Sequence, residues 1–279
     1  MVKIVTDTTT GLPREITQQL GIPVLPQLII FGEESYRDDT ELDTAVFLQK
    51  LKAAASLPKT AAPPPALYNP IYEQLTREGE SVLVVAPSAK VSGTARSAQV
   101  AAQDFPGADI RVFDTQVIAG NFASLVLLAD QYARDGLTGE QIVARLEAWI
   151  PRQRTYFLVD TLEFLQKGGR IGGAKALLGE MLQIKPILCL NHGQVEPCEQ
   201  QRTKKRALAR LVELIEEQCP KGPESHLCVM QAAALDEARS LAEVLKQRMG
   251  LANIPIYELP PAIVVHAGPG ALAVAFFTA

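Results

Sequence analysis

The first half of the chain alternates short apolar segments with longer amphipathic ones. The apolar segments are of strand length and are bounded by turn-forming residues, which predicts strands at residues 3–6, 22–31, 81–86 and 110–113. Helical periodicity predicts helices at residues 11–20, 44–55, 68–78, 92–104, 120–135 and 138–150. Prolines predict a loop at residues 56–66. Strands that alternate with helices indicate an α/β domain with a mainly parallel sheet and flanking helices.

The second half has a less regular pattern. Strands are predicted at residues 155–159, 186–190, 194–197, 227–231, 254–258 and 271–277. Helices are predicted at residues 173–181, 202–218 and 236–249. The turn Asn191-His192-Gly193 joins two of the strands as a hairpin, so a mixed sheet with helices is expected. We place the boundary near Pro151, with an N-terminal domain at residues 1–151 and a C-terminal domain at 152–279.

Polar side chains cluster where the predicted parallel strands end. Such clusters follow Thr6, Ala86 and Phe113. Ligands of open parallel sheets bind outside the carboxyl ends of the strands. The pattern therefore predicts a binding site at this edge of the first sheet.

Composition excludes several classes of protein. Hydrophobic residues make up 47% and charged residues 21%, which is typical of a globular chain and not of a disordered one. The net charge of −4 gives no general attraction to nucleic acid or to an anionic membrane. Asp7 interrupts the first apolar run too early for a signal peptide, and runs such as Ala271–Phe277 are too short to span a bilayer. A cytoplasmic protein without stable membrane insertion is expected.

The cysteines and histidines show no metal-binding spacing. The four cysteines are far apart in sequence, and buried free thiols are predicted at Cys189, Cys198, Cys219 and Cys228. The three histidines are not spaced with them as zinc ligands are. We therefore expect neither a metal site nor a cofactor.

The segment Ser92-Gly93-Thr94 follows a predicted strand and opens a predicted helix. Helix N-termini offer free N–H groups and a positive dipole end, so two hydroxyls and a glycine there suit an anion. The alternative is that Ser92 only caps the helix, and the triplet by itself favours this alternative. Thr60, beside Lys59, also has two interpretations: it donates to an oxyanion, or it is a surface loop residue.

Two further residues have chemistry that suits an anionic ligand. Arg170 lies in the glycine-dense segment 167–173, where it can pair with a carboxylate or remain solvated. His266 precedes Gly268-Pro269-Gly270, where it can donate a hydrogen bond, shuttle a proton or serve only as a half-buried structural residue. The chain carries neither a phosphate-binding loop nor a nucleophile elbow.

A basic stripe is predicted on the helix at residues 202–218. Arg202, Arg206 and Arg210 recur at four-residue spacing, with Lys204 and Lys205 between them. A solvated face is the simplest interpretation, and a docking surface for an acidic protein is the alternative. RNA is disfavoured because no aromatic residues are interspersed.

Taken together, these motifs resemble the DegV family of bacterial fatty-acid-binding proteins. The match extends over nearly the whole chain, and its order and spacing make it specific. The residues that carry it are Thr6-Asp7-Thr8-Thr9 with Leu12-Pro13, Lys59-Thr60 before Pro63, Ser92-Gly93-Thr94 with Ser97-Ala98, Asp114-Thr115, Leu162-Glu163-Phe164-Leu165, Lys167-Gly168-Gly169-Arg170-Ile171, Ile184-Lys185-Pro186-Ile187-Leu188, Arg202 before two lysines, and His266 with Gly268-Pro269-Gly270.

The resemblance implies a lipid-binding carrier, not an enzyme. A long-chain fatty acid would lie where the two domains meet, with its tail in the C-terminal domain. Its carboxylate would be bound by residues of the N-terminal loops and by two from the second half, namely Thr60, Ser92, Gly93, Thr94, Arg170 and His266. A separate fatty acid kinase, docked at Arg202 and Arg206, would convert the acid to an acyl phosphate that feeds phospholipid synthesis. The alternative is a hydrolase or phosphotransferase that acts on a small anionic substrate through His266.

The chain departs from the family pattern beside the expected head-group site. The family usually has Ser-Gln after the Lys-Thr pair, where this chain has Ala61-Ala62. The change removes two polar groups, so the exact set of hydrogen bonds to the ligand is left open. The preferred chain length and saturation of the acid are also left open.

Overall fold

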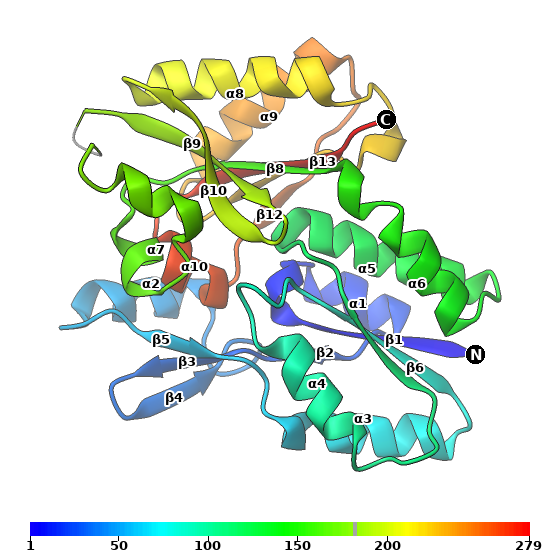
Figure 1. Ribbon diagram of the computed structural model, residues 1–279. Helices are drawn as coiled ribbons and strands as arrows, with labels where there is room; N and C mark the ends of the chain where they lie inside the picture. Colours follow the sequence, from blue (N-terminus) through cyan, green and yellow to red (C-terminus); the bar gives the residue numbers. More distant parts are fainter. Residues whose placement is uncertain (181–182) are drawn as a thin grey trace.

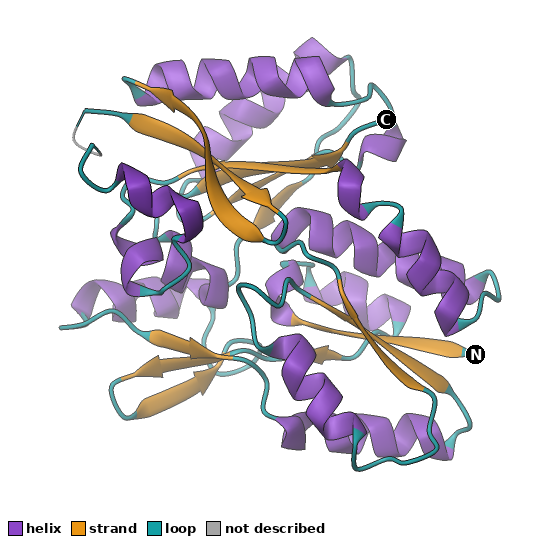
Figure 2. Ribbon diagram, viewed as in Figure 1, coloured by secondary structure: helices purple, strands orange, loops and turns teal. Residues whose placement is uncertain are grey.

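The computed structural model describes residues 1–180 and 183–279 of the chain. Three sheets and the helices packed on them make up the molecule, as Figures 1 and 2 show. The first sheet is parallel and the largest is mixed, so the predicted α/β class is confirmed. Both chain termini lie on the same side of the molecule in Figure 1.

The parallel sheet has the strand order β2-β1-β6-β7. Its strands are β1 (Val2–Asp7), β2 (Val24–Leu25), β6 (Ser81–Ala86) and β7 (Ile110–Asp114). Its helices are α1 (Arg14–Leu20), α3 (Pro65–Arg77), α4 (Thr94–Ala102), α5 (Ala119–Arg134) and α6 (Gly139–Glu147). Successive strand residues face opposite sides. Ile4 therefore packs in the core with α5 and α6, while Val5 packs in the core with α3 and α4.

The mixed sheet has the strand order β10-β9-β8-β13-β11-β12. Its strands are β8 (Gln153–Leu158), β9 (Lys185–Asn191), β10 (Gln194–Gln201), β11 (Cys228–Gln231), β12 (Ile256–Glu258) and β13 (Leu272–Phe277). One face packs on α8 (Lys204–Gln218) and α9 (Leu235–Met249). The other face meets α7 (Glu163–Lys167), α10 (Pro261–Ala267) and the start of α5. The predicted hairpin of β9 and β10 is confirmed.

A small antiparallel sheet was not predicted from the sequence. It has the order β4-β3-β5, formed by β3 (Leu28–Phe31), β4 (Glu34–Arg37) and β5 (Lys59–Ala61), and α2 (Thr44–Ala53) lies nearby. The predicted strand at residues 22–31 is wrong as one element, because the chain leaves the first sheet near Pro26 and Leu28 begins a strand of the small sheet. The predicted loop at 56–66 is also wrong in part, since Ile29 pairs with Thr60.

The small sheet and α2 share a core with the second half of the chain. Ile29, Phe47 and Leu51 belong to the same buried cluster as Leu165 and Val264. In Figure 1 α2 lies beside α7 and α10. The two halves therefore interlock at this place and do not meet across a simple linker.

Two predicted helices need correction, and one helix was not predicted. The segment at residues 173–181 is a short 3₁₀ helix, Gly172–Leu177, and Met181 lies outside the described residues. The apolar run before His266 is a helix, α10, that periodicity over so few residues could not reveal. Helix α8 begins at Lys204 because Thr203 caps it, so Arg202 is not part of the helix.

Within the described residues, no helix has the length and apolar character needed to cross a membrane.

Candidate functional site

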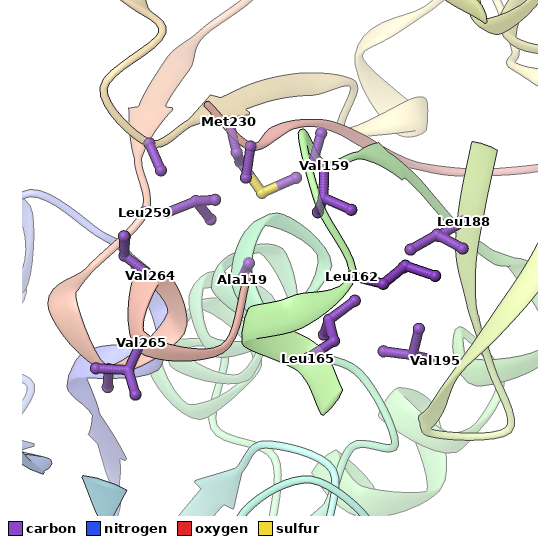
Figure 3. Packing of buried hydrophobic residues seen from close by; sticks show 14 of the residues in the cluster. Ala119, Val159, Leu162, Leu165, Leu188, Val195, Met230, Leu259, Val264 and Val265 are labelled. Atoms are coloured by element: carbon purple, nitrogen blue, oxygen red, sulfur yellow. The ribbon is translucent and has the colours of Figure 1, made fainter. Parts of the chain in front are cut away.

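A cavity lies between the parallel sheet and the mixed sheet. It encloses about 970 Å³ of empty space, its open mouth included. Most of the wall is apolar, and its larger side chains are Ile118, Phe157, Leu165, Leu190, Val195, Met230, Leu259 and Ile263. Figure 3 shows Met230, Leu259 and Ala119 on one side of this region and Leu165 near Val195 on the other. The residues come from both halves of the chain, so the cavity exists only where the halves meet.

One part of the wall is polar. It consists of Thr9, Gln27, Thr60, Ser92, Gly93, Arg170 and His266. Five of the six residues predicted for a carboxylate site are thus brought to one wall, although they are far apart in sequence. The sixth, Thr94, is buried and does not line the cavity.

Thr60 and His266 are positioned by elements that the sequence did not predict. The pairing of β5 with β3 directs Thr60 toward the cavity, and α10 carries His266 in its last turn. The Thr60 hydroxyl and His266 Nε2 are 2.8 Å apart and share a hydrogen bond. His266 Nδ1 is buried and has no partner among the described residues. A Cβ at position 168 would lie 2.2 Å from Nδ1, so Gly168 leaves the room that the imidazole occupies.

Burial, with a smaller contribution from the charge of Arg170, lowers the pKa of His266 to about 4. The folded protein thus holds a neutral imidazole, whereas the unfolded chain protonates near 6.5. Stability from this group is therefore complete above pH 6.5 and is lost as the pH falls toward 4.

We expect His266→Asn to flatten this part of the stability profile. Between pH 6.5 and pH 4 the free energy of unfolding of the wild type should fall by about 3 kcal/mol more than that of the variant. Urea unfolding at a series of pH values measures it. His192→Asn, which changes an exposed histidine in the turn between β9 and β10, is the matched control. Parallel profiles for wild type and His266→Asn would contradict the expectation.

Arg170 connects the two halves of the chain at the polar wall. Its Nε donates to the carbonyl of Val91 at 3.1 Å, and Nη1 donates to the carbonyl of Gly168 at 2.8 Å. Half-buried, it forms no ion pair with any carboxylate of the described residues, and burial lowers its pKa. The guanidinium stays charged at neutral pH, so the cavity contains a positive charge whose partners are carbonyl oxygens.

The Ser92-Gly93-Thr94 segment does not cap α4 in the expected way. The N-cap position is Gly93, and no side chain bonds to the first turn from there. The Ser92 hydroxyl lies 3.0 Å from the Thr94 hydroxyl and accepts from the Thr94 N–H at 3.3 Å. Ser92 therefore precedes the N-cap position; its hydroxyl still accepts from the first N–H of α4, and it also lies at the cavity wall.

Sequence reasoning missed Asp7 and Gln27. Asp7 is fully buried at the end of β1 and accepts hydrogen bonds from Gln27 Nε2 and from the Thr94 hydroxyl. Gln27 reaches the cavity from the turn between β2 and β3. Asp7 belongs to a polar cluster that the sequence did identify, but nothing near Gln27 in sequence signals a role.

The basic residues near α8 differ from the predicted stripe. Arg202 and Arg206 are exposed. Arg210 instead contacts Glu199, Glu213 and Glu217, so its charge is compensated. The exposed positive charge is thus concentrated at the N-terminal end of α8, where the helix dipole adds to it.

The cysteines are free, but only Cys219 and Cys228 are buried; Cys189 is half-buried and Cys198 is exposed. The prediction of buried thiols is therefore wrong for two of the four. In the part of the chain that the structure describes, no group of three or more His, Cys, Asp or Glu side chains is placed to hold a metal ion.

Comparisons with known proteins agree on one family. The family model described as DegV matches residues 1–279. A DegV domain-containing protein of Streptomyces coelicolor is 36% identical over 275 residues, which are 98% of this chain and 97% of that protein. Protein DegV of Bacillus subtilis is 32% identical over 274 residues, or 98% of each chain.

Solved structures show the same fold. A DegV family protein from Thermus thermophilus, described by its fatty acid binding, superposes with a TM-score of 0.90 at 32% identity, over 100% of this chain and 99% of that one. A fatty-acid-binding DegV family protein from Streptococcus agalactiae gives a TM-score of 0.91 at 30% identity, with 100% and 99% covered.

Proposed function

Because the chain belongs to the DegV family, we propose that it binds a long-chain fatty acid between its two domains. The domains are residues 1–151, which supply the carboxylate-binding loops, and residues 152–279, which house the acyl tail. The protein acts as a cytoplasmic carrier that presents the acid to a fatty acid kinase. The relatives from Thermus thermophilus and Streptococcus agalactiae, both described as fatty-acid-binding, support this assignment.

The charge of Arg170 is the observation that carries the proposal. A half-buried cation without a carboxylate partner among the described residues lies at the polar wall of an otherwise apolar cavity. A buried charge is costly unless an opposite charge compensates it. A fatty acid supplies both features that the cavity lacks, an anion at one end and hydrocarbon along the rest.

The remaining head-group contacts follow from the polar wall. The hydroxyls of Thr60 and Ser92 and the backbone at Gly93 donate to the carboxylate, and His266 orients Thr60 through their hydrogen bond. Thr94 contributes indirectly, through its contact with Ser92. Ala62 lies beside Gly93 and offers no polar atom from its side chain, which keeps the number of donors small.

Burial of the tail and contacts to the head have different roles. About fourteen methylenes of a sixteen-carbon acid contribute on the order of 11 kcal/mol relative to water. A hydrogen bond to the charged carboxylate contributes only about 1.5–3 kcal/mol. Cellular fatty acids come from membranes, however, where the tail is already buried and this gain largely cancels. The polar wall therefore decides whether the protein can take an acid from a membrane.

The proposed ligand can be tested directly. The purified protein is extracted with organic solvent and the extract is analysed by mass spectrometry for free fatty acids. The delipidated protein is then titrated with palmitate. Recovery of a long-chain acid together with saturable rebinding supports the function. A protein that neither retains nor rebinds any fatty acid contradicts it.

Ser92→Ala should weaken retention of the acid by about tenfold without unfolding the protein. The hydroxyl lies at the cavity wall, and the native structure loses only its contact with the Thr94 hydroxyl and a long hydrogen bond of 3.3 Å from the Thr94 N–H. Quantifying the acid that remains bound after gel filtration gives the result. Ser97→Ala, in the adjoining helix α4 but outside the cavity wall, is the control. An unchanged fatty acid content in Ser92→Ala would refute the role of this hydroxyl.

Presentation to a kinase requires an exposed docking surface. The exposed charges of Arg202 and Arg206 supply one for an acidic face of the kinase, which phosphorylates the carboxylate to an acyl phosphate for phospholipid synthesis. The double variant Arg202→Glu, Arg206→Glu should bind fatty acid normally and reduce the rate of acyl phosphate formation by about tenfold or more. A coupled assay with the purified kinase compares it with Arg239→Glu, on α9. Equal rates would contradict docking at this surface.

The alternative enzymatic function gains no support from the geometry. A catalytic histidine of the triad type uses its second ring nitrogen to bond an orienting acid. His266 Nδ1 instead has no partner among the described residues.

A further inference from the structure

Asp7 is a buried carboxylate that lies one layer behind the cavity wall. It is fully buried, and Thr94, Thr9 and Gln27 around it are almost fully buried as well. Thr9 and Gln27 line the cavity, whereas Asp7 itself does not. Asp7 can therefore act on a ligand only through these neighbours.

Four donors surround Asp7. Oδ1 accepts from the backbone N–H of Thr9 at 2.8 Å and from the Thr9 hydroxyl. Oδ2 accepts from Gln27 Nε2 at 2.7 Å and from the Thr94 hydroxyl. When Asp7 is ionised, the hydroxyl of Thr94 therefore donates its only proton to Asp7.

The hydroxyl of Thr94 connects Asp7 to Ser92. The oxygens of Thr94 and Ser92 are 3.0 Å apart, so one of them must donate to the other. Because Thr94 has given its only hydroxyl proton to an ionised Asp7, Ser92 is the donor. The Ser92 proton then points away from the cavity, and Ser92 offers the ligand only lone pairs.

A proton on Asp7 reverses this chain. Protonated Oδ2 donates to the Thr94 oxygen, which also accepts from Gln27 Nε2 at 3.0 Å. Thr94 then donates to Ser92, and the Ser92 proton turns toward the cavity. Every oxygen keeps its hydrogen bonds, and the only net change is the uptake of one proton from solvent onto Asp7.

We propose that Asp7 is the positioning residue of the carboxylate site: by taking up a proton it turns the Thr94 and Ser92 hydroxyls so that Ser92 donates to the fatty acid carboxylate. The inference rests on the proposed function, because it concerns the same ligand. It makes binding of the anion and protonation of Asp7 a single coupled event. Because the proton neutralises Asp7, the carboxylate of the fatty acid does not face a second negative charge across the cavity wall.

The surroundings of Asp7 make its protonation easier than that of an exposed aspartate. Burial raises its pKa, although the hydrogen bonds from its neighbours act in the opposite direction. The titratable groups that face it are Asp38 and Tyr68. Burial raises the pKa of Asp38 to about 7, with a smaller contribution from the negative charge of Asp7. Tyr68 is neutral at physiological pH because burial and Asp7 raise its pKa. No cation of the described residues bonds to Asp7.

The coupling is measurable as proton uptake. Delipidated protein is titrated calorimetrically with sodium dodecanoate in phosphate and in Tris at the same neutral pH. The difference in binding enthalpy between buffers gives the number of protons taken up. Thr94→Val interrupts the hydroxyl chain with a side chain of similar shape. Thr155→Val, which removes a buried hydroxyl outside the chain from Asp7 to Ser92, is the matched control, and Asp7→Asn removes the proton acceptor itself.

We expect wild type and Thr155→Val to take up protons on binding, and Thr94→Val and Asp7→Asn to take up none. The affinity of Thr94→Val should change by less than about tenfold. Binding without proton uptake in the wild type overturns the role of Asp7 and leaves the proposed function intact. Uptake that persists in Thr94→Val or Asp7→Asn also overturns it, because the proton would then reside elsewhere, as on His266. Failure of every protein to bind overturns the proposed function together with this inference.

Discussion

Replacing Arg170 by glutamine is expected to weaken fatty acid binding by about a hundredfold. The side chain supplies the positive charge of the polar wall, and it lies in a half-buried place where charge interactions are strong. Loss of a charge-assisted contact of up to about 3 kcal/mol corresponds to roughly this factor. Glutamine has its amide nitrogen at the position of the arginine Nε, so it can still donate to the carbonyl of Val91 and keep this contact between the halves, whereas the contact with the Gly168 carbonyl is lost.

Two further variants separate charge from geometry. Arg170→Lys retains the charge but not the planar fork, and its affinity should lie between those of wild type and Arg170→Gln. Lys167→Gln removes a nearby exposed charge that is paired with Glu163, so its affinity should remain that of the wild type. Fluorescence displacement of a bound fatty acid probe gives all four affinities. If Arg170→Gln binds as tightly as the wild type, Arg170 does not hold the carboxylate.

The sequence predicted the parts of the fold that depend on local pattern. Strand β6 and helix α5 were recognised because each is long and apolar with a clear periodicity. The division of residues 22–31 between two sheets was missed, because pairing partners are long-range and local propensity does not encode them. Strand β5 was missed for a related reason, since the prolines that follow it gave a stronger local signal.

The candidate site was predicted in its residues but not in its connections. Motifs identified Ser92 and Arg170, and the strand-end rule pointed to the edge near Thr9. The third cluster, at Asp114, does not reach the cavity; its carboxylate instead accepts from the backbone N–H groups of Ala89 and Gln116. The contact of Asp7 with Thr94 joins positions that are 87 residues apart, and no local pattern reveals it.

The apolar wall permits a second prediction of large effect. Ala273 lies on β13 between Phe157 of β8 and Met230 of β11, and all three residues line the cavity. On this strand the alternate residues Leu272 and Val274 face the opposite core. A larger side chain at position 273 therefore enters the space proposed for the tail, with little effect on the other face of the sheet.

Ala273→Leu should select against long acids. The added side chain occupies the volume of about three methylenes, which contribute about 0.8 kcal/mol each when buried. Palmitate should then bind about fiftyfold more weakly. Decanoate should bind almost as it does to wild type if its shorter tail ends before this point, so it serves as the internal control for folding and for the head-group contacts. Displacement titrations with the saturated acids between these two locate the length at which the loss begins. An equal loss for every acid would mean that leucine disturbs the fold, and no loss for palmitate would place the tail along another wall of the cavity.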